Sequence, residues 1–440
     1  MKNKFLKFGM LLTLLCNVGC SKESSSSYIS SNNNNSSTNK LSFSDLPTFN
    51  ITTNGIKIPS KDDENYKDYA AVEIDYNYDD ESFIDLEAKI RIRGTSSRWF
   101  DKKGYKIKFS TKKSLIKSTK NKKYNLLASY MDPCKLRDYL ALSISYNMNI
   151  NSNRYAPKPT LATLNIDKKN YGLYLLTDDI EANEGRIPLD EYNASDIKVP
   201  FILEMDTVAY KEGKEDIDYF ALGTTEVFKY DGNEYADLLY VYDTPEDLNE
   251  EQRKYIKDYI SECRQCLVDK DIASFAELVD LDAFIDYWLL GELFRNTDMA
   301  GRSVYMYKQN AESKLIFGPS WDFDYSCSRP YQLGPNTDYS LDNAKDRFTN
   351  YDWWSLFLNI EESSKYICNR YKAYLRKIYL EEIENAKKYY YKYEELIKTD
   401  ASIWYSEKIN DTNKLVDDNF KWTCNYFELR MEMMDSLFNK

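Results

Sequence analysis

The most informative absence in this chain of 440 residues is histidine, which does not occur at all. Without it, Ser-His-Asp and Cys-His nucleophile activation, histidine-ligated zinc and histidine proton shuttles are excluded. Any acid–base or metal chemistry must therefore use carboxylates, lysine, tyrosine or cysteine.

The chain also lacks an excess of positive charge. Its net charge is −12 and its pI is near 4.9. General nucleic-acid binding relies on Lys and Arg to neutralise phosphates, so this balance argues against a nucleic-acid partner. After the first 20 residues, no segment is apolar for long enough to span a bilayer.

Cysteine is scarce, with eight residues in all, and only Cys263 and Cys266 form a close CRQC pair outside the first 20 residues. A single CxxC without a second pair or histidine partners is a weak metal motif. The surrounding helical pattern favours two half-buried helix side chains, with a disulfide or metal site as the alternative.

The N-terminal residues 1–20 have a basic start, an apolar run centred on Leu11–Leu15, and Gly19 before Cys20. This pattern predicts a signal peptide, and its end resembles a bacterial lipoprotein signal in which Cys20 carries the lipid. Ordinary cleavage or a retained N-terminal anchor are the alternatives. Residues 21–42 are rich in Ser and Asn and predict a flexible linker. We therefore expect an exported protein, held by a lipid anchor at the cell surface or in the periplasm.

Alternating apolar residues predict mostly antiparallel strands in the first part of the folded chain, and helical periodicity follows later. This order predicts an α+β domain with segregated helices. The expected strands are 86–93 and 105–109, joined by the basic loop RGTSSRWFDKKG, then a hairpin at 161–176, a strand at 199–206, and a hairpin from 303–308 and 314–317; the expected helices are 134–148, 248–267, 280–294 and those beyond about residue 360.

Two aspartates flank a phenylalanine in the stretch GPSWDFDYS at 318–326. In a strand or strand end, Asp322 and Asp324 share one face, about 6–7 Å apart, which lets them close around a hard cation or a phosphate–metal complex. Upstream, the NTD triplet places Asn296 and Asp298 where an amphipathic helix ends. The alternative is that one aspartate caps a turn and the other pairs with a lysine.

Phosphoryl transfer needs only parts that this chain contains. A loop and cations hold phosphates, carboxylates hold Mg²⁺, and an aspartate orients or deprotonates the acceptor. The RGTSSR loop supplies the cations, although such loops are usually just solvated.

The motifs, in their order along the chain, resemble the CotH kinase family, the spore-coat-H-like atypical protein kinases. The resemblance spans roughly residues 45–330 and rests on RGTSSRWFDKKGYKIKF, NLLASYMDPCKLRDYLAL, YGLYLLTDDIE, FILEMD, NTDMAGRSVYMYK and GPSWDFD. It implies an atypical protein-kinase-like fold at 43–345, followed by a C-terminal helical region at 346–440. It also implies ATP and Mg²⁺ (or Mn²⁺) as cofactors and serines of other proteins as substrates.

The resemblance also implies roles for individual residues. Asp298 matches the catalytic base and Asp322 the principal metal ligand. The further implied metal ligands are Asp324 and Ser303, the latter standing where kinase-like members carry Asn. The implied nucleotide contacts are Lys106, with Lys103 or Lys108 as alternatives, and Arg93 and Glu204; Asp178 lies at a further motif position.

Three functions follow as hypotheses. The first is an extracytoplasmic protein serine kinase that acts on surface or secreted proteins and touches the membrane only through its lipid. The second is a catalytically inactive surface-binding or adhesion protein on the same scaffold. The third is a carbohydrate-active protein, since paired carboxylates and abundant aromatics also occur in glycoside hydrolases.

Overall fold

The computed structural model describes residues 41–440, apart from positions 61, 66, 95–96, 117, 153, 207–217, 224–227, 231–232, 236–237, 328–338, 347–351 and 440. Cys20, the predicted signal peptide and residues 21–40 of the predicted linker lie outside the described residues. Among the helices of the described part, none combines the length and apolar character that crossing a bilayer requires.

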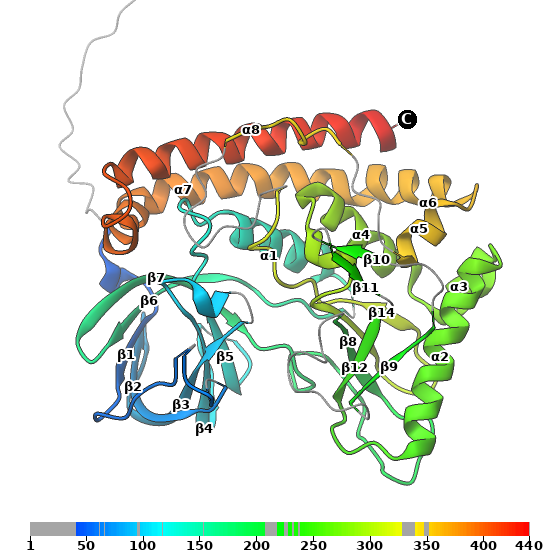
Figure 1. Ribbon diagram of the computed structural model, residues 1–440, viewed down its shortest axis with the longest axis horizontal. Coiled ribbons are helices and arrows are strands. Elements are labelled where there is room, and N and C mark those ends of the chain that lie inside the picture. The colour runs from blue at the N-terminus through cyan, green and yellow to red at the C-terminus, as the bar shows by residue number, and fades with distance from the viewer. Residues whose placement is uncertain are drawn as a thin grey trace, which may run out of the picture. The chain divides into compact units, whose positions relative to one another are not determined.

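Seven strands of the N-terminal part close into a barrel in the order β1-β2-β3-β4-β5-β7-β6 (Figure 1). The predicted alternation is confirmed in its central pair, where Ile90 of β3 lies opposite Ile107 of β4 and both side chains are fully buried. The closure was not predicted, because it depends on parallel pairing of β1 with β6, which no local pattern reveals. The strands are β1 Thr48–Thr52, β2 Ala70–Tyr78, β3 Glu81–Arg93, β4 Gly104–Lys113, β5 Asn121–Leu127, β6 Thr160–Ile166 and β7 Lys169–Asp178.

A second sheet of five strands, in the order β14-β13-β8-β12-β9, follows the barrel. Its central strand β8 is the one predicted at 199–206, and its β13-β14 pair is the predicted hairpin. The strands are β8 Phe201–Met205, β9 Tyr219–Ala221, β12 Leu239–Thr244, β13 Val304–Lys308 and β14 Leu315–Phe317, and a separate small hairpin joins β10 Phe228–Tyr230 to β11 Asn233–Tyr235.

The helices confirm an α+β arrangement in which strands dominate the first part of the chain and helices the last (Figure 1). Their bounds are α1 Arg137–Asn149, α2 Glu250–Val268, α3 Ile272–Leu278, α4 Leu281–Phe294, α5 Asp352–Leu358, α6 Ser363–Arg370, α7 Arg376–Tyr405 and α8 Thr412–Phe438. Helix α4 matches the helix predicted at 280–294, and its N-cap is Asp280, which accepts a hydrogen bond from the Ala283 amide at 2.9 Å. It is buried on nearly every side rather than along one stripe. The CRQC pair lies on α2, and both of its thiols are free.

Helices α7 and α8 lie side by side and pack onto the rest of the unit (Figure 1). Helix α7 contacts α1 and β7, and α8 contacts α4. Two buried ion pairs anchor them: Asp400 of α7 to Lys102 at 2.7 Å, and Arg430 of α8 to Glu292 of α4 at 2.9 Å. The C-terminal helices share a hydrophobic core with the five-stranded sheet, and the interior of the barrel forms a separate cluster.

The close approach of α7 to β7 requires glycine at position 172. Its φ is +76°, and an added Cβ would lie 2.2 Å from Oδ1 of Asp400. We expect Gly172→Ala to lower the free energy of unfolding by about 2–4 kcal/mol, because it adds backbone strain and displaces a buried carboxylate from its cations. Urea unfolding measures this change.

Gly55→Ala is the matched control, since Gly55 has a φ of +80° with no atom within 4 Å of an added Cβ. Gly55→Ala adds only backbone strain, so it should lower the free energy of unfolding by about 1 kcal/mol. Equal losses in the two variants would show that the contact with Asp400 contributes nothing.

Candidate functional site

A polar cleft of about 290 Å³ lies where the barrel meets the five-stranded sheet. The barrel side supplies the cations and Asp179, and the sheet side and the loop after β14 supply the other carboxylates. The predicted residues Arg93, Lys106, Glu204, Ser303 and Asp322 all line it, together with Lys67, Arg91, Asp179, Asp206, Asp243, Tyr305 and Trp321. Residues from eight separate segments of the chain thus meet in one place.

The NTD triplet and the WDFD stretch are joined by one fully buried amide. Asn296 caps the short 3₁₀ turn η4 at Thr297–Ala300, where its Oδ1 accepts a hydrogen bond from the Asp298 amide at 3.1 Å. Its Nδ2 donates to the Asp322 carbonyl at 2.9 Å. Asn296 therefore positions both aspartates through their backbones.

The carboxylates of Asp298, Asp322 and Asp324 converge, with one oxygen of each lying within 4.8 Å of the others. The expected strand at WDFD is wrong: β14 ends at Phe317, and Asp322 has a left-handed φ of 61°. Asp322 and Asp324 still meet, and Asn296 ties the backbone of Asp322 to that of Asp298 beside them. Local alternation predicted their proximity for the wrong reason.

Repulsion between the buried carboxylates of this cluster favours the binding of a cation. Burial, together with the charges of Asp322, Asp138 and Asp298, raises the pKa of Asp324 well above its usual range. Nearby, burial raises the pKa of Asp138 to about 6, and the charge of Asp322 adds to the rise. Carboxylate oxygens are the donors that Mg²⁺ and Mn²⁺ prefer, and a divalent cation would remove this repulsion. The donor set fits such a cation.

Lys106 on β4 is held by an ion pair of 2.7 Å to Asp179, which also accepts a hydrogen bond from Asn125 at 3.0 Å. Burial acts to raise the pKa of Asp179, but the charge and hydrogen bond of Lys106 outweigh it and hold that pKa below its ordinary value. Sequence reasoning singled out Asp178 and missed Asp179. The two consecutive aspartates at the end of β7 could have indicated that one of them faces the cleft. Successive strand residues face opposite sides, so only one of the two reaches the cleft.

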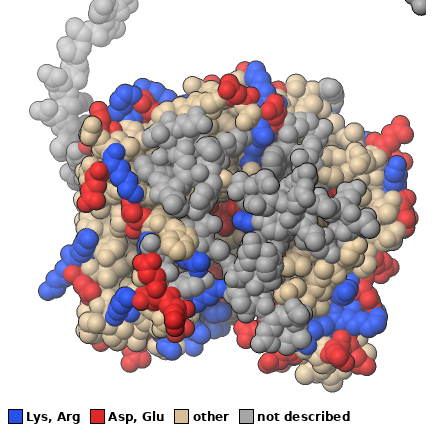
Figure 2. Space-filling model, in the orientation of Figure 1, with Lys and Arg blue, Asp and Glu red and all other residues tan. Residues whose placement is uncertain are grey.

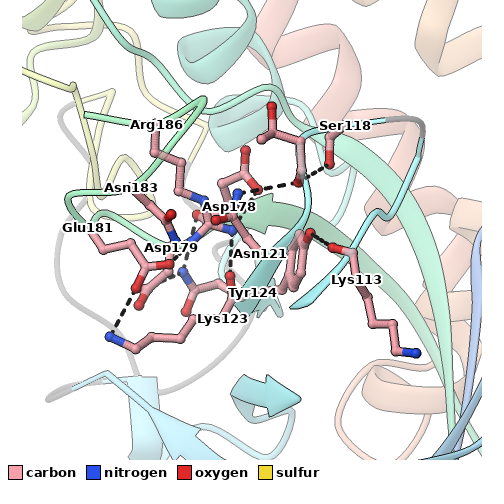
Figure 3. A network of polar contacts seen from close by, with 12 residues as sticks. Lys113, Ser118, Asn121, Lys123, Tyr124, Asp178, Asp179, Glu181, Asn183 and Arg186 are labelled. Atoms are coloured by element: carbon pink, nitrogen blue, oxygen red, sulfur yellow. Dashed lines mark hydrogen bonds and ion pairs between the residues drawn. The ribbon is translucent and has the colours of Figure 1, made fainter. Parts of the chain in front are cut away.

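The predicted motif residue Asp178 is the one that faces away. Its carboxylate accepts a hydrogen bond from Arg186 at 2.8 Å and lines another cavity. Figure 3 shows this network, in which Asp178 and Asp179 lie close together while Lys123 pairs with Glu181. Asp178 thus supports the strand end rather than the cleft.

The remaining predicted residues fall into two groups. Arg93 stacks over Trp321, with its guanidinium 5.1 Å from the ring centroid, and the Ser303 hydroxyl lies 3.4 Å from Oδ2 of Asp322. Lys103 instead donates to the Phe100 carbonyl and is absent from the cleft lining, and Lys108 is exposed on the barrel wall. Of the three lysines that sequence left open, the structure brings Lys106 to the cleft.

Figure 2 shows cations and anions side by side across the face in view.

Comparison with known proteins adds one match. The sequence model of the CotH kinase protein matches residues 90–434, which include every cleft residue named above except Lys67, all of α7 and most of α8. A search of curated proteins finds no match.

Proposed function

The chain belongs to the CotH kinase family, and from this premise we propose that its cleft binds ATP with Mg²⁺ or Mn²⁺ and transfers phosphate to serines of surface or secreted proteins. The observation that carries the proposal is the division of charge in the cleft, where Lys106 and Arg93 face carboxylates of the five-stranded sheet and Asp322. Asp322 also belongs to the cluster of three carboxylates, of which Asp324 lines an adjoining cavity. Lipidation of Cys20 and export remain part of this proposal.

The basic wall suits the phosphates of a nucleotide. Lys106 is oriented by Asp179, the arrangement that ordinary protein kinases obtain from a strand lysine and a helix glutamate. Arg93 presents its guanidinium beside the same space, with its plane supported by Trp321. Both cations are held in place before any ligand arrives, so little side-chain ordering is lost on binding.

Asp322 and Asp324, with the Ser303 hydroxyl beside them, are the groups that would hold the cation. A bound divalent ion supplies charge neutralisation at the phosphate oxygens. Asp298 then serves as the base that accepts the proton of the serine hydroxyl. Its position on η4 is set by Asn296, which also sets Asp322, so base and cation site share one support.

Ser303 favours the second hypothesis, an inactive binding protein on the same scaffold, because a hydroxyl is a weaker ligand than the amide oxygen it replaces. Restoring the family residue by Ser303→Asn separates the two: phosphate transfer rises if the kinase function holds.

The glycoside-hydrolase hypothesis fits less well. Three carboxylates within 4.8 Å suit a cation, whereas glycosidases use two carboxyls about 5–9.5 Å apart.

Metal-dependent nucleotide binding is the first test. In a thermal unfolding assay of the purified protein, we expect ATP with Mg²⁺ to stabilise the fold by about 2.7 kcal/mol at a hundredfold excess over Kd. Asp322→Asn should abolish this gain. Asparagine tolerates a left-handed φ, so the variant keeps its fold.

Two matched controls sharpen the result. Asp342→Asn alters an exposed aspartate outside the cleft, and Lys108→Met alters the lysine two residues beyond Lys106 on the same strand. Both should respond to MgATP as the wild type does, while Lys106→Met should not. A well-folded protein that shows no shift with any nucleotide would contradict the kinase proposal and favour the binding protein.

A further inference from the structure

Beyond the cleft, the outer face of the barrel carries a block of cations on three adjacent strands. Cations occupy most outward positions here: Lys89, Arg91 and Arg93 on β3, and Lys106 and Lys108 on β4, with Lys123 next on β5. The block is bounded by Gly104 opposite Arg93 and by Glu87 on β3. The alternate positions, such as Ile90 and Ile107, fill the barrel core. We refer to these six residues as the cationic wall.

Register places like charges of the cationic wall directly opposite one another. Lys89 pairs with Lys108, Lys108 pairs with Lys123, and Arg91 pairs with Lys106. Like charges directly opposite one another on neighbouring strands destabilise a sheet. The net charge of the chain is −12, so a local concentration of positive charge is unusual here. Because these opposed charges do not stabilise the sheet, we interpret them as a surface that binds an anionic ligand.

The wall is only partly neutralised from within. Asp179 pairs with Lys106 and Glu181 with Lys123, and Arg91 stacks over Tyr69. Lys89 and Lys108 are exposed and have no ion-pair partner among the residues that the structure describes. The inner end of the wall lines the cleft, so its free outer end lies beside the site of proposed transfer.

We propose that the cationic wall docks an acidic segment of the protein substrate, next to the serine that is phosphorylated. Alternate residues on a strand lie about 6–7 Å apart, and the same spacing separates alternate side chains of an extended peptide. An extended segment along β3 can therefore match Lys89 and Arg91 with Glu or Asp at every second position, with Lys108 of β4 opposite Lys89, while Lys106 and Arg93 remain with the nucleotide. This inference rests on the proposed kinase function, because it assumes that the protein has a substrate to phosphorylate. The binding experiment does not assume that function, since it needs no catalysis.

Binding without nucleotide tests the docking surface. The probe is a fluorescein-labelled nonapeptide with a central serine and Glu at alternate positions, and a matched peptide carries Gln instead. Fluorescence anisotropy at low salt should show binding of the Glu peptide alone. Replacing Lys89 and Lys108 together by Ser should weaken that binding roughly fivefold to tenfold, as expected for the loss of two exposed charge contacts.

A charge-matched control is the double variant Lys257→Ser with Lys365→Ser, two exposed lysines on α2 and α6. It should bind the Glu peptide as the wild type does. The wall variant should unfold at no lower temperature than the wild type, since it removes opposed like charges, and its MgATP shift should be unchanged.

Three results would overturn the proposal: equal weakening in both double variants, equal binding of the Gln peptide, or displacement of the Glu peptide by inorganic polyphosphate at far lower concentration. The last would assign the wall to a polyanion. Because the peptide-binding assay needs no catalysis, the two proposals can fail independently. Failure of the docking proposal appears in peptide binding, and failure of the kinase proposal appears in the MgATP shift and in phosphate transfer.

Discussion

Asp298→Asn is expected to lower phosphate transfer to serine by about 10²–10⁴-fold while leaving MgATP binding in place. The substitution keeps the size of the side chain but removes the carboxylate that accepts the proton of the acceptor hydroxyl, and general-base catalysis contributes a factor of this size. The hydrogen bond from the Asp298 amide to Asn296 is unaffected, so η4 should keep its conformation. Single-turnover transfer of labelled phosphate to a serine peptide measures the loss.

The thermal shift with MgATP provides the control for this variant. A shift like that of the wild type shows that the cleft is intact and that the loss lies in chemistry. Asp342→Asn should lose neither property. If Asp298→Asn transferred phosphate at the wild-type rate, Asp298 would not be the base. If it lost nucleotide binding as well, Asp298 would belong with the cation ligands instead.

The second large effect concerns the anchoring of α7. Asp400 is fully buried and bonds Lys102 at 2.7 Å, lies 3.3 Å from Lys135, and accepts a hydrogen bond from the Leu173 amide at 2.8 Å. Asp400→Leu leaves two buried ammonium groups without their counter-charge. We expect it to lower the free energy of unfolding by about 3–5 kcal/mol, the usual cost of removing one partner from a buried ion pair.

Chemical denaturation measures this loss, and Asp258→Leu on α2 is the control. Asp258 also pairs with a lysine, Lys254 at four residues' spacing, but both side chains are more than half exposed. Exposed pairs of this kind contribute little. If the two variants lost similar stability, the buried pair would not be what fastens α7 to the barrel.

Local sequence patterns were sufficient wherever a structure repeats over a few residues. The strands at 86–93 and 105–109 were predicted because apolar side chains alternate there, and the helix at 280–294 was predicted because its apolar residues recur at helical spacing. The grouping of Asp298 with the WDFD pair came from the order of the motifs and from the family resemblance. No periodicity in the chain brings 298 and 322 together.

The details of the site were harder to predict because they depend on single backbone angles and facing directions. Asp322 meets Asp298 through a left-handed residue and a buried amide, not through a strand. Asp179 rather than Asp178 reaches Lys106, because only one of two adjacent strand-end residues faces the cleft. A one-residue difference in facing direction is invisible to composition and spacing.

By itself, then, the sequence determined the chemistry open to this protein, because the absence of histidine leaves carboxylates, lysine, tyrosine and cysteine. Local periodicity also predicted several of its strands and helices. Tertiary structure alone decided that β1 closes a barrel against β6, that α7 and α8 complete the core, and that cations and carboxylates face each other across one cleft. The physical reason is that these features arise from contacts between residues far apart in the chain. The free energy of such contacts depends on the whole fold and not on any short stretch of residues.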